Sequence, residues 1–437
     1  MKLLNLIKID VLGCFLLCSA NAAAQQNGDS IAEYASFDKY RFGGYGEMVA
    51  AFKDYGTNRF YGNNEGNPKT HRNTISIPRF VLAGDYKFNS KWVLGAEIEF
   101  ESGGTGMAYE LENTENGEYE TEVEKGGEVA IEQFHITRLI HPAFNVRAGH
   151  IIVPVGQNNA HHEPINFFGT VRPEGETSII PNTWHENGIE FFGQFGKGYG
   201  SFNYEAMIVA GLNANGFDRN NWANGANARV FEEDNFTQPA YVARLNYTGV
   251  PGLRLGAAFY YCKNVGDNAD KEQTYKGYGA MPVRIWNVEG QYKNKYVEAR
   301  VNYLVGNLTN SDVLSAKNNK LSNKSPYSRL TPIAHEAVAY GGEVGLNIRS
   351  MMNDARCPNV IPFVRYEYYN SQEKGEGMDV MDNRLKTSMW VAGVNWRALP
   401  NLVVKADYTS RSIDGGNYNS ENEFAVGAAF TGWFTKK

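Results

Sequence analysis

The sequence predicts an all-β protein, a 16-stranded antiparallel transmembrane β-barrel, and three observations lead to it. Segments in which apolar and polar residues alternate recur along the whole chain, as they do in half-buried strands. Tight turns and long polar connections alternate between these segments, which is typical of periplasmic turns and extracellular loops. The 26 Tyr and 24 Phe residues suit the aromatic girdles at the two membrane interfaces. The alternative, a soluble two-sheet β protein, does not explain why short and long connections alternate along the chain.

The N-terminal residues are expected to be a signal peptide. A basic start, an apolar run over 11–20 and the small residues 22–24 make up the three parts of such a segment. We therefore expect a signal peptide over 1–24, a short periplasmic segment over 25–39 and a transmembrane barrel over 40–437. No later run is apolar enough to predict a membrane helix.

Period-two alternation defines the strands. Residues 91–101 show it most clearly, since one face is wholly apolar and the other carries two carboxylates. Strand 73–88 contains Pro78, which predicts a bulge, and strand 128–140 has mixed parity. The full set is 40–53, 73–88, 91–101, 128–140, 143–151, 184–195, 199–212, 237–248, 252–262, 282–293, 295–305, 334–350, 359–370, 387–397, 401–411 and 423–434.

This number of strands carries a functional expectation. A barrel of sixteen strands is too wide to be filled by its wall side chains and encloses an aqueous channel. Segment 25–39 is too short to form the separate plug domain of the larger, 22-stranded transporters. A water-filled passage is therefore predicted.

Cys262 and Cys357 are the cysteines left after signal removal. The topology places Cys262 at the outer end of a strand and Cys357 in a periplasmic turn. They would lie about a membrane thickness apart, far beyond the roughly 7 Å Cα limit of a disulfide. Two unpaired thiols are predicted.

A motif follows the fifth strand, where Arg147, Gly149, Pro154 and Gly156 form an R-x-G-x-x-x-x-P-x-G pattern. It resembles the phosphate-selective porin O and P family, in which this pattern leads into the constriction loop. The resemblance implies a homotrimeric channel in the outer membrane of a Gram-negative bacterium, with an inward-folded third extracellular loop. That loop, 152–183, contains no Lys, and the family's basic ladder has no recognisable counterpart, so phosphate selectivity is not carried over.

Loop 152–183 is interpreted as a constriction, because its several prolines fix the shape of a long loop and charges at a narrow point set selectivity. A solvated surface loop is the alternative. A metal site and cofactors are not expected, because adjacent side chains of a His-His-Glu run point apart and no second ligand pair has the required spacing. The charged candidates for the constriction are His161, His162, Glu163, Arg172, Glu174 and Glu176.

Inward parity also assigns charges to the lumen wall. Opposed basic and acidic walls would create a transverse field, and the alternative is that neighbouring groups such as Glu298 and Arg300 satisfy each other. The lumen candidates are Arg79, Glu97, Glu99, Arg147, Arg244, Arg254, Arg300, Glu343, Arg365 and Lys405.

These features together predict a porin, a passive water-filled channel for small hydrophilic solutes or ions. A plugged or structural barrel used for adhesion or scaffolding is the alternative. A barrel enzyme is disfavoured, since no G-x-S-x-G nucleophile motif occurs. The expected partners are outer-membrane lipid and lipopolysaccharide, and no nucleic acid. The strongly acidic loop 102–128 is a solvated surface loop or a Ca²⁺ site. The sequence leaves the solute, the pore radius and gating open.

Overall fold

The structure is a computed structural model. It describes residues 34–60, 65–102, 104, 107–113, 119–125, 127–227, 234–269, 275–321, 327–354, 356–377 and 380–437. The expected signal peptide over 1–24, and the part of segment 25–39 up to residue 33, lie outside these residues. Within the described part of the chain, no helix is both long and apolar enough to cross a membrane.

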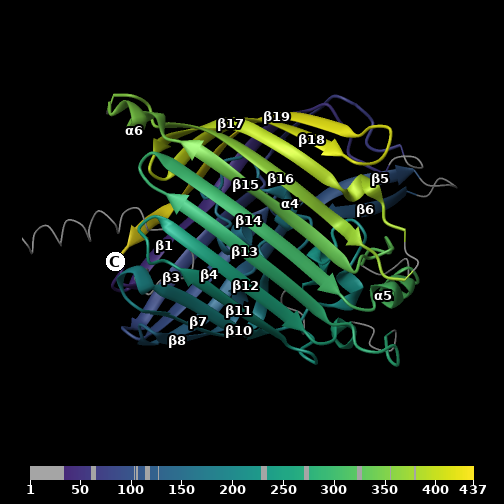
Figure 1. Ribbon diagram of the computed structural model, residues 1–437, viewed down its shortest axis with the longest axis horizontal. Helices are drawn as coiled ribbons and strands as arrows, with labels where there is room; N and C mark the ends of the chain where they lie inside the picture. The colour runs from purple at the N-terminus through teal and green to yellow at the C-terminus, as the bar shows by residue number, and fades with distance from the viewer. Residues whose placement is uncertain are drawn as a thin grey trace, which may run out of the picture.

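Antiparallel strands close into a tilted barrel (Figure 1). Each wall strand pairs with the next wall strand along the chain, except that β2 and β3 both pair with β1, and β1 pairs with β19 to complete the ring. The predicted 16-stranded antiparallel barrel is thereby confirmed, with β2 and β3 sharing one position beside β1. The wall strands are β1 (Tyr40–Lys53), β2 (Arg72–Ser76), β3 (Arg79–Asn89), β4 (Trp92–Glu101), β7 (Glu128–His141), β8 (Phe144–Ile152), β9 (His185–Phe195), β10 (Phe202–Val209), β11 (Ala240–Tyr247), β12 (Leu253–Cys262), β13 (Val283–Lys293), β14 (Val297–Leu308), β15 (Glu336–Leu346), β16 (Val360–Lys374), β17 (Thr387–Leu399), β18 (Leu402–Ile413) and β19 (Ser420–Lys436).

Pro78 separates β2 from β3. On β1, the residues from Lys53 to Val49 pair with β2, and the pairing resumes at Gly46 with β3. Because proline has no N–H to donate, the ladder is interrupted at this point. The irregularity predicted from Pro78 is present.

A second irregularity explains the mixed parity of strand 128–140. On β4, Glu97 pairs with Gln133 and the next residue, Ile98, pairs with Ile131, so Glu132 is an extra residue on β7. A bulge of this kind re-aims a side chain. Both Glu132 and Gln133 are buried in the lumen, and the inward parity changes from even to odd positions at this bulge.

The two faces of the wall differ in polarity. On β18, Val404 and Tyr408 are exposed, whereas Lys405 and Asp407 between them are buried. Exposed aromatic pairs such as Phe42 and Phe434 lie on neighbouring strands of the outer surface. An apolar outer face over a polar inner face is the arrangement of a barrel in lipid.

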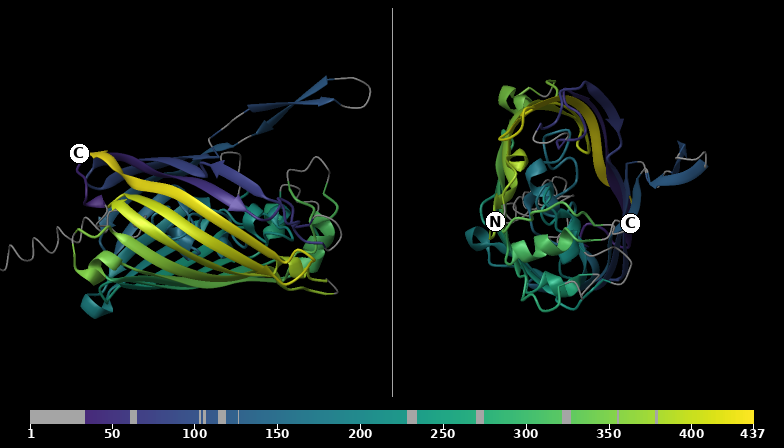
Figure 2. Two further views of the ribbon diagram at one scale, coloured as in Figure 1. Left: turned by 90° about the horizontal axis from the view of Figure 1, so that it is seen from above. Right: turned by 90° about the vertical axis from the view of Figure 1, so that its right-hand side faces the viewer.

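Connections at the end of the barrel opposite the termini carry short helices (Figure 2). Their apolar residues, with those of nearby strand ends, form a buried core that includes Ile179, Trp184, Phe217, Trp222 and Leu314. The lumen is therefore partly filled by packed loops, a feature that the sequence analysis did not predict. These helices are α3 (Gln157–Ala160), α4 (Glu174–Thr177), η2 (Ala214–Gly216), η3 (Asn224–Ala226), η4 (Val265–Asn268), α5 (Ser311–Asn318) and η6 (Asn383–Leu385); η1 (Gly198–Gly200) and α6 (Ile348–Met352) occupy short turns at the other end.

Two further sequence expectations concern connections. Stretch 102–128, expected to be a solvated loop, instead contains the hairpin of β5 (Met107–Asn113) and β6 (Tyr119–Lys125). Glutamates occupy alternate positions in both strands, but the stretch was interpreted as a loop because of its acidic charge. Cys262 and Cys357 are both free, as predicted.

Residues 34–39 pack against the inside of the barrel near its termini. Tyr34 and Phe37 are buried against Val93 and Phe192. A guanidinium N–H of Arg147 donates to the Tyr34 hydroxyl over 2.9 Å. This described part of the expected N-terminal segment therefore covers some of that end of the lumen.

Candidate functional site

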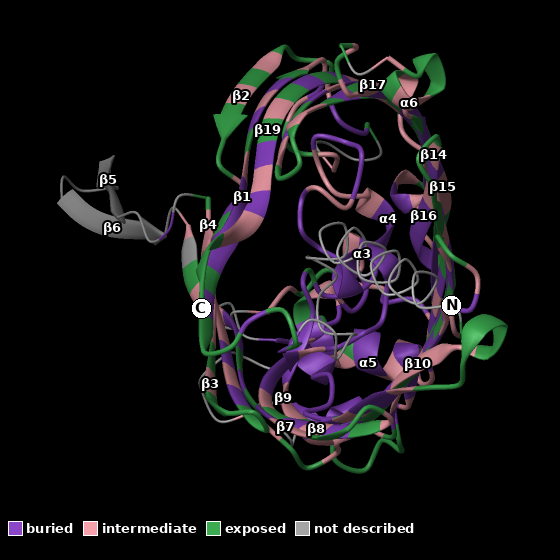
Figure 3. Ribbon diagram, turned by 90° about the vertical axis from the view of Figure 1, so that its left-hand side faces the viewer, coloured by how far each residue is buried: buried purple, intermediate pink, exposed green. Residues whose placement is uncertain are grey.

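The connection between β8 and β9, residues 153–184, is called the lumen segment below. Its helices α3 and α4 lie inside the ring of strands (Figure 3). Most of its side chains are buried. The segment leaves the wall at the R-x-G-x-x-x-x-P-x-G motif, where Gly156 has φ +94°, a value that only glycine adopts readily.

Strand β18 holds the middle of the lumen segment. The Lys405 ammonium donates to the carbonyl oxygens of Pro164 at 2.5 Å, Phe167 at 2.9 Å and Gly169 at 2.8 Å. Two residues on, Asp407 accepts from the backbone N–H of Thr170 at 2.6 Å. Since alternate residues of a strand share a face, one inward row of β18 binds consecutive residues of the segment.

Other strands hold both halves of the segment. Arg244 on β11 donates to the carbonyl of Pro154 over 3.2 Å, and Asn287 on β13 accepts from the N–H of Gly156 over 3.3 Å. On β16, Glu367 accepts from the N–H of Gly175 over 2.9 Å. The segment is thus hydrogen-bonded to strands on different parts of the ring.

Glu176 fixes the start of α3. Its carboxylate accepts the backbone N–H groups of Gln157, Asn158 and Asn159 at 2.9, 2.8 and 3.2 Å. These are the donors that a helix start leaves unpartnered. Burial, with Glu289 adding to it, raises the pKa of Glu176 to about 7 against the opposing effect of these bonds.

Glu174 is ion-paired across the lumen. Nε of Arg411 lies 3.0 Å from both of its carboxylate oxygens, and the Tyr369 hydroxyl donates to it over 2.9 Å. Burial alone would raise the pKa of Glu174, but Arg411 outweighs burial and lowers this pKa to about 2.

The three adjacent candidates of the His-His-Glu run point to different partners. His161 contacts the Arg254 guanidinium, His162 faces Glu132 on β7, and Glu163 accepts from the Asn166 amide over 2.6 Å. Burial, with nearby arginines adding to it, lowers the pKa values of His161 and His162 well below the usual range.

Arg172 is half-buried in the lumen segment. It donates to the Thr183 hydroxyl over 3.1 Å. That hydroxyl also accepts from Arg79 at 3.1 Å, so the two guanidinium groups share one acceptor near the point where the segment returns to β9.

The lumen charges are neutralised locally. Each arginine among the candidates has a carboxylate partner, while Lys405 binds carbonyls and Glu97 accepts from the Gln133 amide over 2.8 Å. This pattern matches the local-pairing alternative rather than two opposed charged walls. Glu298, however, pairs with Arg397 and Lys293 and not with Arg300. The pairs are Arg79–Glu99, Arg147–Glu190, Arg244–Glu289, Arg254–Glu289, Arg300–Glu343 and Arg365–Glu367.

Sequence reasoning missed several residues of this site. Glu132 was not identified because the bulge reverses the inward parity of β7. The mixed pattern of apolar and polar residues in this strand was itself a signal of a bulge. Asn302, which donates to Glu176, and Tyr45, which donates to Glu132 over 2.8 Å, carry no charge and so were not selected.

Polar hollows adjoin the lumen segment. One cavity of about 70 Å³ is lined by Arg41, Glu97, Gln133, Arg147 and Ala160, among others. A wider hollow of about 380 Å³ includes Arg59, Arg72, Glu174, Arg411 and Glu421. Both contain polar groups suited to small hydrated solutes.

Solved structures with the same fold are outer-membrane porins and channels. Salmonella typhi OmpF in complex with daunomycin has a TM-score of 0.54 and 11% identity, over 91% of this chain and 99% of that chain. The outer membrane channel DcaP of Acinetobacter baumannii gives 0.52 and 11%, over 93% and 100%. The anion-selective porin from Comamonas acidovorans gives 0.51 and 10%, over 90% and 100%. These identities are low enough that the likeness shows the fold alone.

Sequence comparison adds little. No family model matches the chain. An uncharacterized protein of Aquifex aeolicus (strain VF5) is 33% identical over 172 residues, which is 39% of this chain. The match spans about a third of that protein, at 32%.

The closed sixteen-stranded ring, its apolar outer surface and its polar interior define the class of the protein. It is a transmembrane β-barrel, and its fold is that of the outer-membrane porins and channels to which it is similar.

Proposed function

We propose that the protein is a passive, narrow channel for small hydrophilic solutes or ions, with the lumen segment as its constriction. The observation that carries this proposal is the attachment of the segment to strands across the lumen, through Arg244, Lys405 and Arg411. A constriction selects by size only if its position is fixed. Charge-assisted hydrogen bonds are strong enough to fix it.

The constriction candidates divide into two groups in this proposal. The buried group holds the segment through contacts within it or against the wall, and it consists of His161, His162, Glu163 and Glu176. Arg172 and Glu174 are half-buried and lie where passing solutes can meet them. Selectivity is assigned to this second group.

The oligomeric state and the finer family are also proposals. A homotrimer and membership of the phosphate-selective porin O and P family are both implied by the R-x-G-x-x-x-x-P-x-G motif. Phosphate is not the proposed solute, because Lys405 in the lumen already binds three carbonyls. Small polar solutes are proposed in its place.

The test is single-channel conductance of the purified protein in planar bilayers, with the reversal potential under a KCl gradient. We expect resolved steps in groups of three, smaller than those of a general porin because packed loops fill part of the lumen. Heat-modifiable mobility in gel electrophoresis would verify that the sample is folded. Absence of steps in a folded sample would overturn the channel and favour the plugged or structural barrel.

A further inference from the structure

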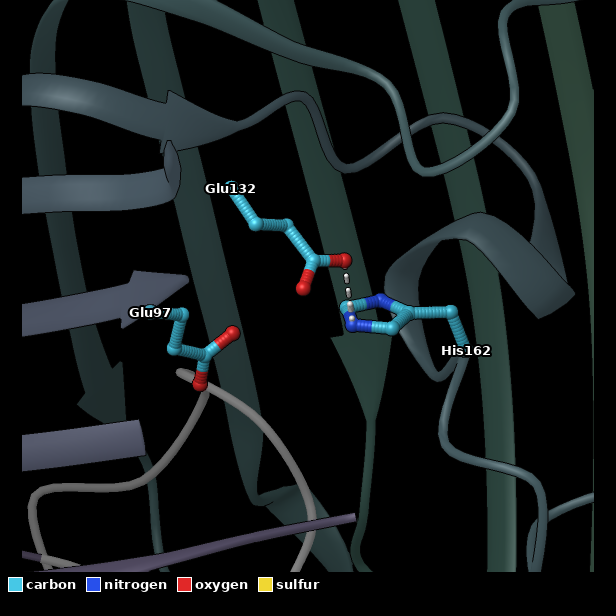
Figure 4. Close-up of side chains that lie close together, drawn as sticks. All are labelled: Glu97, Glu132 and His162. Atoms are coloured by element: carbon cyan, nitrogen blue, oxygen red, sulfur yellow. Dashed lines mark ion pairs between the residues drawn. The ribbon is translucent and has the colours of Figure 1, made fainter. Parts of the chain in front are cut away.

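Three side chains from distant parts of the sequence meet in the lumen. His162 comes from the lumen segment, Glu97 from β4 and Glu132 from the bulge of β7, and all three point toward one another (Figure 4). One ligand atom from each lies within 4.8 Å of the other two. His162 and Glu132 are completely buried.

The contact between His162 and Glu132 lacks a hydrogen bond. His162 Nδ1 lies 3.1 Å from the carbonyl oxygen of Asn159, which can only accept, so Nδ1 carries the proton. In the neutral ring with this tautomer, Nε2 presents a lone pair to Glu132 Oε1, which lies 3.2 Å away. Neither atom has a hydrogen-bond partner. Two buried acceptors then face each other, and a proton or a metal ion between them would satisfy both.

Further carboxylates lie close to the contact between His162 and Glu132. Glu47 and Glu99 also face Arg79, at 3.8 and 3.4 Å, and Arg79 lies 3.8 Å from Glu132 Oε1. Arg172 is the other guanidinium in electrostatic contact with this group. Four carboxylates therefore surround two guanidinium groups.

Two further guanidinium groups lie beside Glu97. Arg41 and Arg147 line the cavity beside Glu97. Each has a carboxylate of its own, since Arg41 lies 2.5 Å from Asp85 and Arg147 lies 3.0 Å from Glu190. A divalent cation would offset the buried charge of Glu132 at its contact with His162.

We propose that His162, Glu132 and Glu97 bind a divalent transition-metal ion of the zinc type, with water in the remaining position. One imidazole nitrogen and two carboxylates are a ligand set that Zn²⁺ accepts. Ligands about 2.1 Å from a tetrahedral zinc stand about 3.4 Å apart. The 3.2 Å between Nε2 and Oε1 is close to that spacing, and the ligand atom of Glu97 lies within 4.8 Å of both.

The outer contacts orient the ligands in the way metal sites require. Besides the Asn159 carbonyl on His162, the Tyr45 hydroxyl donates to Glu132 Oε2 over 2.8 Å, and the Gln133 amide donates to Glu97 Oε2 over 2.8 Å. Such partners fix ligand orientation and raise affinity. The cavity of about 70 Å³ that Glu97 lines gives a hydrated ion an approach.

The test is calorimetric titration of the metal-stripped, folded protein in detergent with ZnCl₂ at pH 7.5. We expect one Zn²⁺ per chain, with affinity at least tenfold weaker in His162→Gln and Glu132→Gln. The matched control is His141→Ala, an exposed histidine on β7, which should bind like the wild type. His162→Cys should restore binding and, with Co²⁺ in place of Zn²⁺, add a thiolate-to-metal absorption band.

No saturable binding to the wild type up to millimolar Zn²⁺ would overturn the proposal and leave a proton shared by His162 and Glu132 as the explanation. Undiminished binding in His162→Gln would overturn it as well. If these variants fail to fold, the His162→Cys absorption band decides. Because binding is measured without current, its failure and the failure of the channel proposal are distinguishable.

Discussion

Lys405 and Asp407 hold the two sides of one peptide bond. The Lys405 ammonium donates to the carbonyl oxygen of Gly169 at 2.8 Å, and the Asp407 carboxylate accepts from the N–H of Thr170 at 2.6 Å. These two backbone groups belong to the same peptide unit. Glycine is favoured at position 169, since a Cβ would lie 2.9 Å from the backbone carbonyl oxygen of Val171. The wall thus determines both the position and the orientation of the lumen segment at this point.

Replacing Lys405 with methionine should loosen the lumen segment. Three buried carbonyls lose their donor, and each unpartnered polar group costs roughly 1–3 kcal/mol. We expect a higher and noisier conductance in planar bilayers and faster cleavage of the segment by protease. Lys386→Met, which removes an exposed lysine paired with Asp414, should change neither. Unaltered conductance of folded Lys405→Met would count against a clamp formed by Lys405 and Asp407 on the peptide unit of Gly169 and Thr170.

The clamp also predicts coupling between its two residues. Because Lys405 and Asp407 bind one peptide unit, losing either contact weakens the other. A double-mutant cycle of Lys405→Met and Asp407→Ala should give a coupling of about 1 kcal/mol in the free energy of unfolding. Lys405→Met with Arg356→Met, an exposed arginine in a short turn, should be additive. Additivity of the first pair would mean that the two contacts act independently.

The pair of Glu174 and Arg411 predicts a loss of stability in acid. The pKa of Glu174 in the folded protein is about 2, below its ordinary value of 4.5. The pair therefore stabilises the fold fully above pH 4.5 and loses its effect as the pH falls from 4.5 to 2. The contribution is on the order of 3 kcal/mol. Thermal unfolding should show wild type and Glu174→Gln converging at the acid end of this window, and a constant difference between them would contradict the assignment.

Gly156→Ala should destabilise the entry into the lumen segment. The residue has φ +94°, and a Cβ would lie 2.6 Å from Glu176 Oε2, which binds the start of α3. A strained backbone of this kind costs roughly 1–3 kcal/mol. Gly200→Ala is the matched control, because its Cβ would meet nothing within 4 Å. Unfolding midpoints in detergent would compare them, and equal midpoints would show that Gly156 is dispensable.

Much of the fold could be predicted because its signals are local. Period-two alternation in segments such as 252–262, now β12, and the alternation of short and long connections depend only on neighbouring residues. They predicted sixteen strands, and Pro78 predicted an irregularity within segment 73–88. The inward positions of Arg244 and Lys405 followed from the same parity.

The chemistry of the lumen could be predicted only in part. Parity identified which side chains point inward, but not which of them pair. Packing of the connections into an apolar core around Trp222 and Ile179 was also missed, because it depends on contacts between loops far apart in sequence.

The sequence by itself determined the class of architecture, the strand positions and the inward charges of this protein. Only the tertiary structure decided that Lys405 and Asp407 clamp the peptide bond between Gly169 and Thr170, and that Glu132 meets His162 and Glu97. The physical reason is distance along the chain. A strand pattern repeats every two residues, whereas these contacts depend on the path of a long segment across the barrel and on one inserted residue that changes the direction of a side chain.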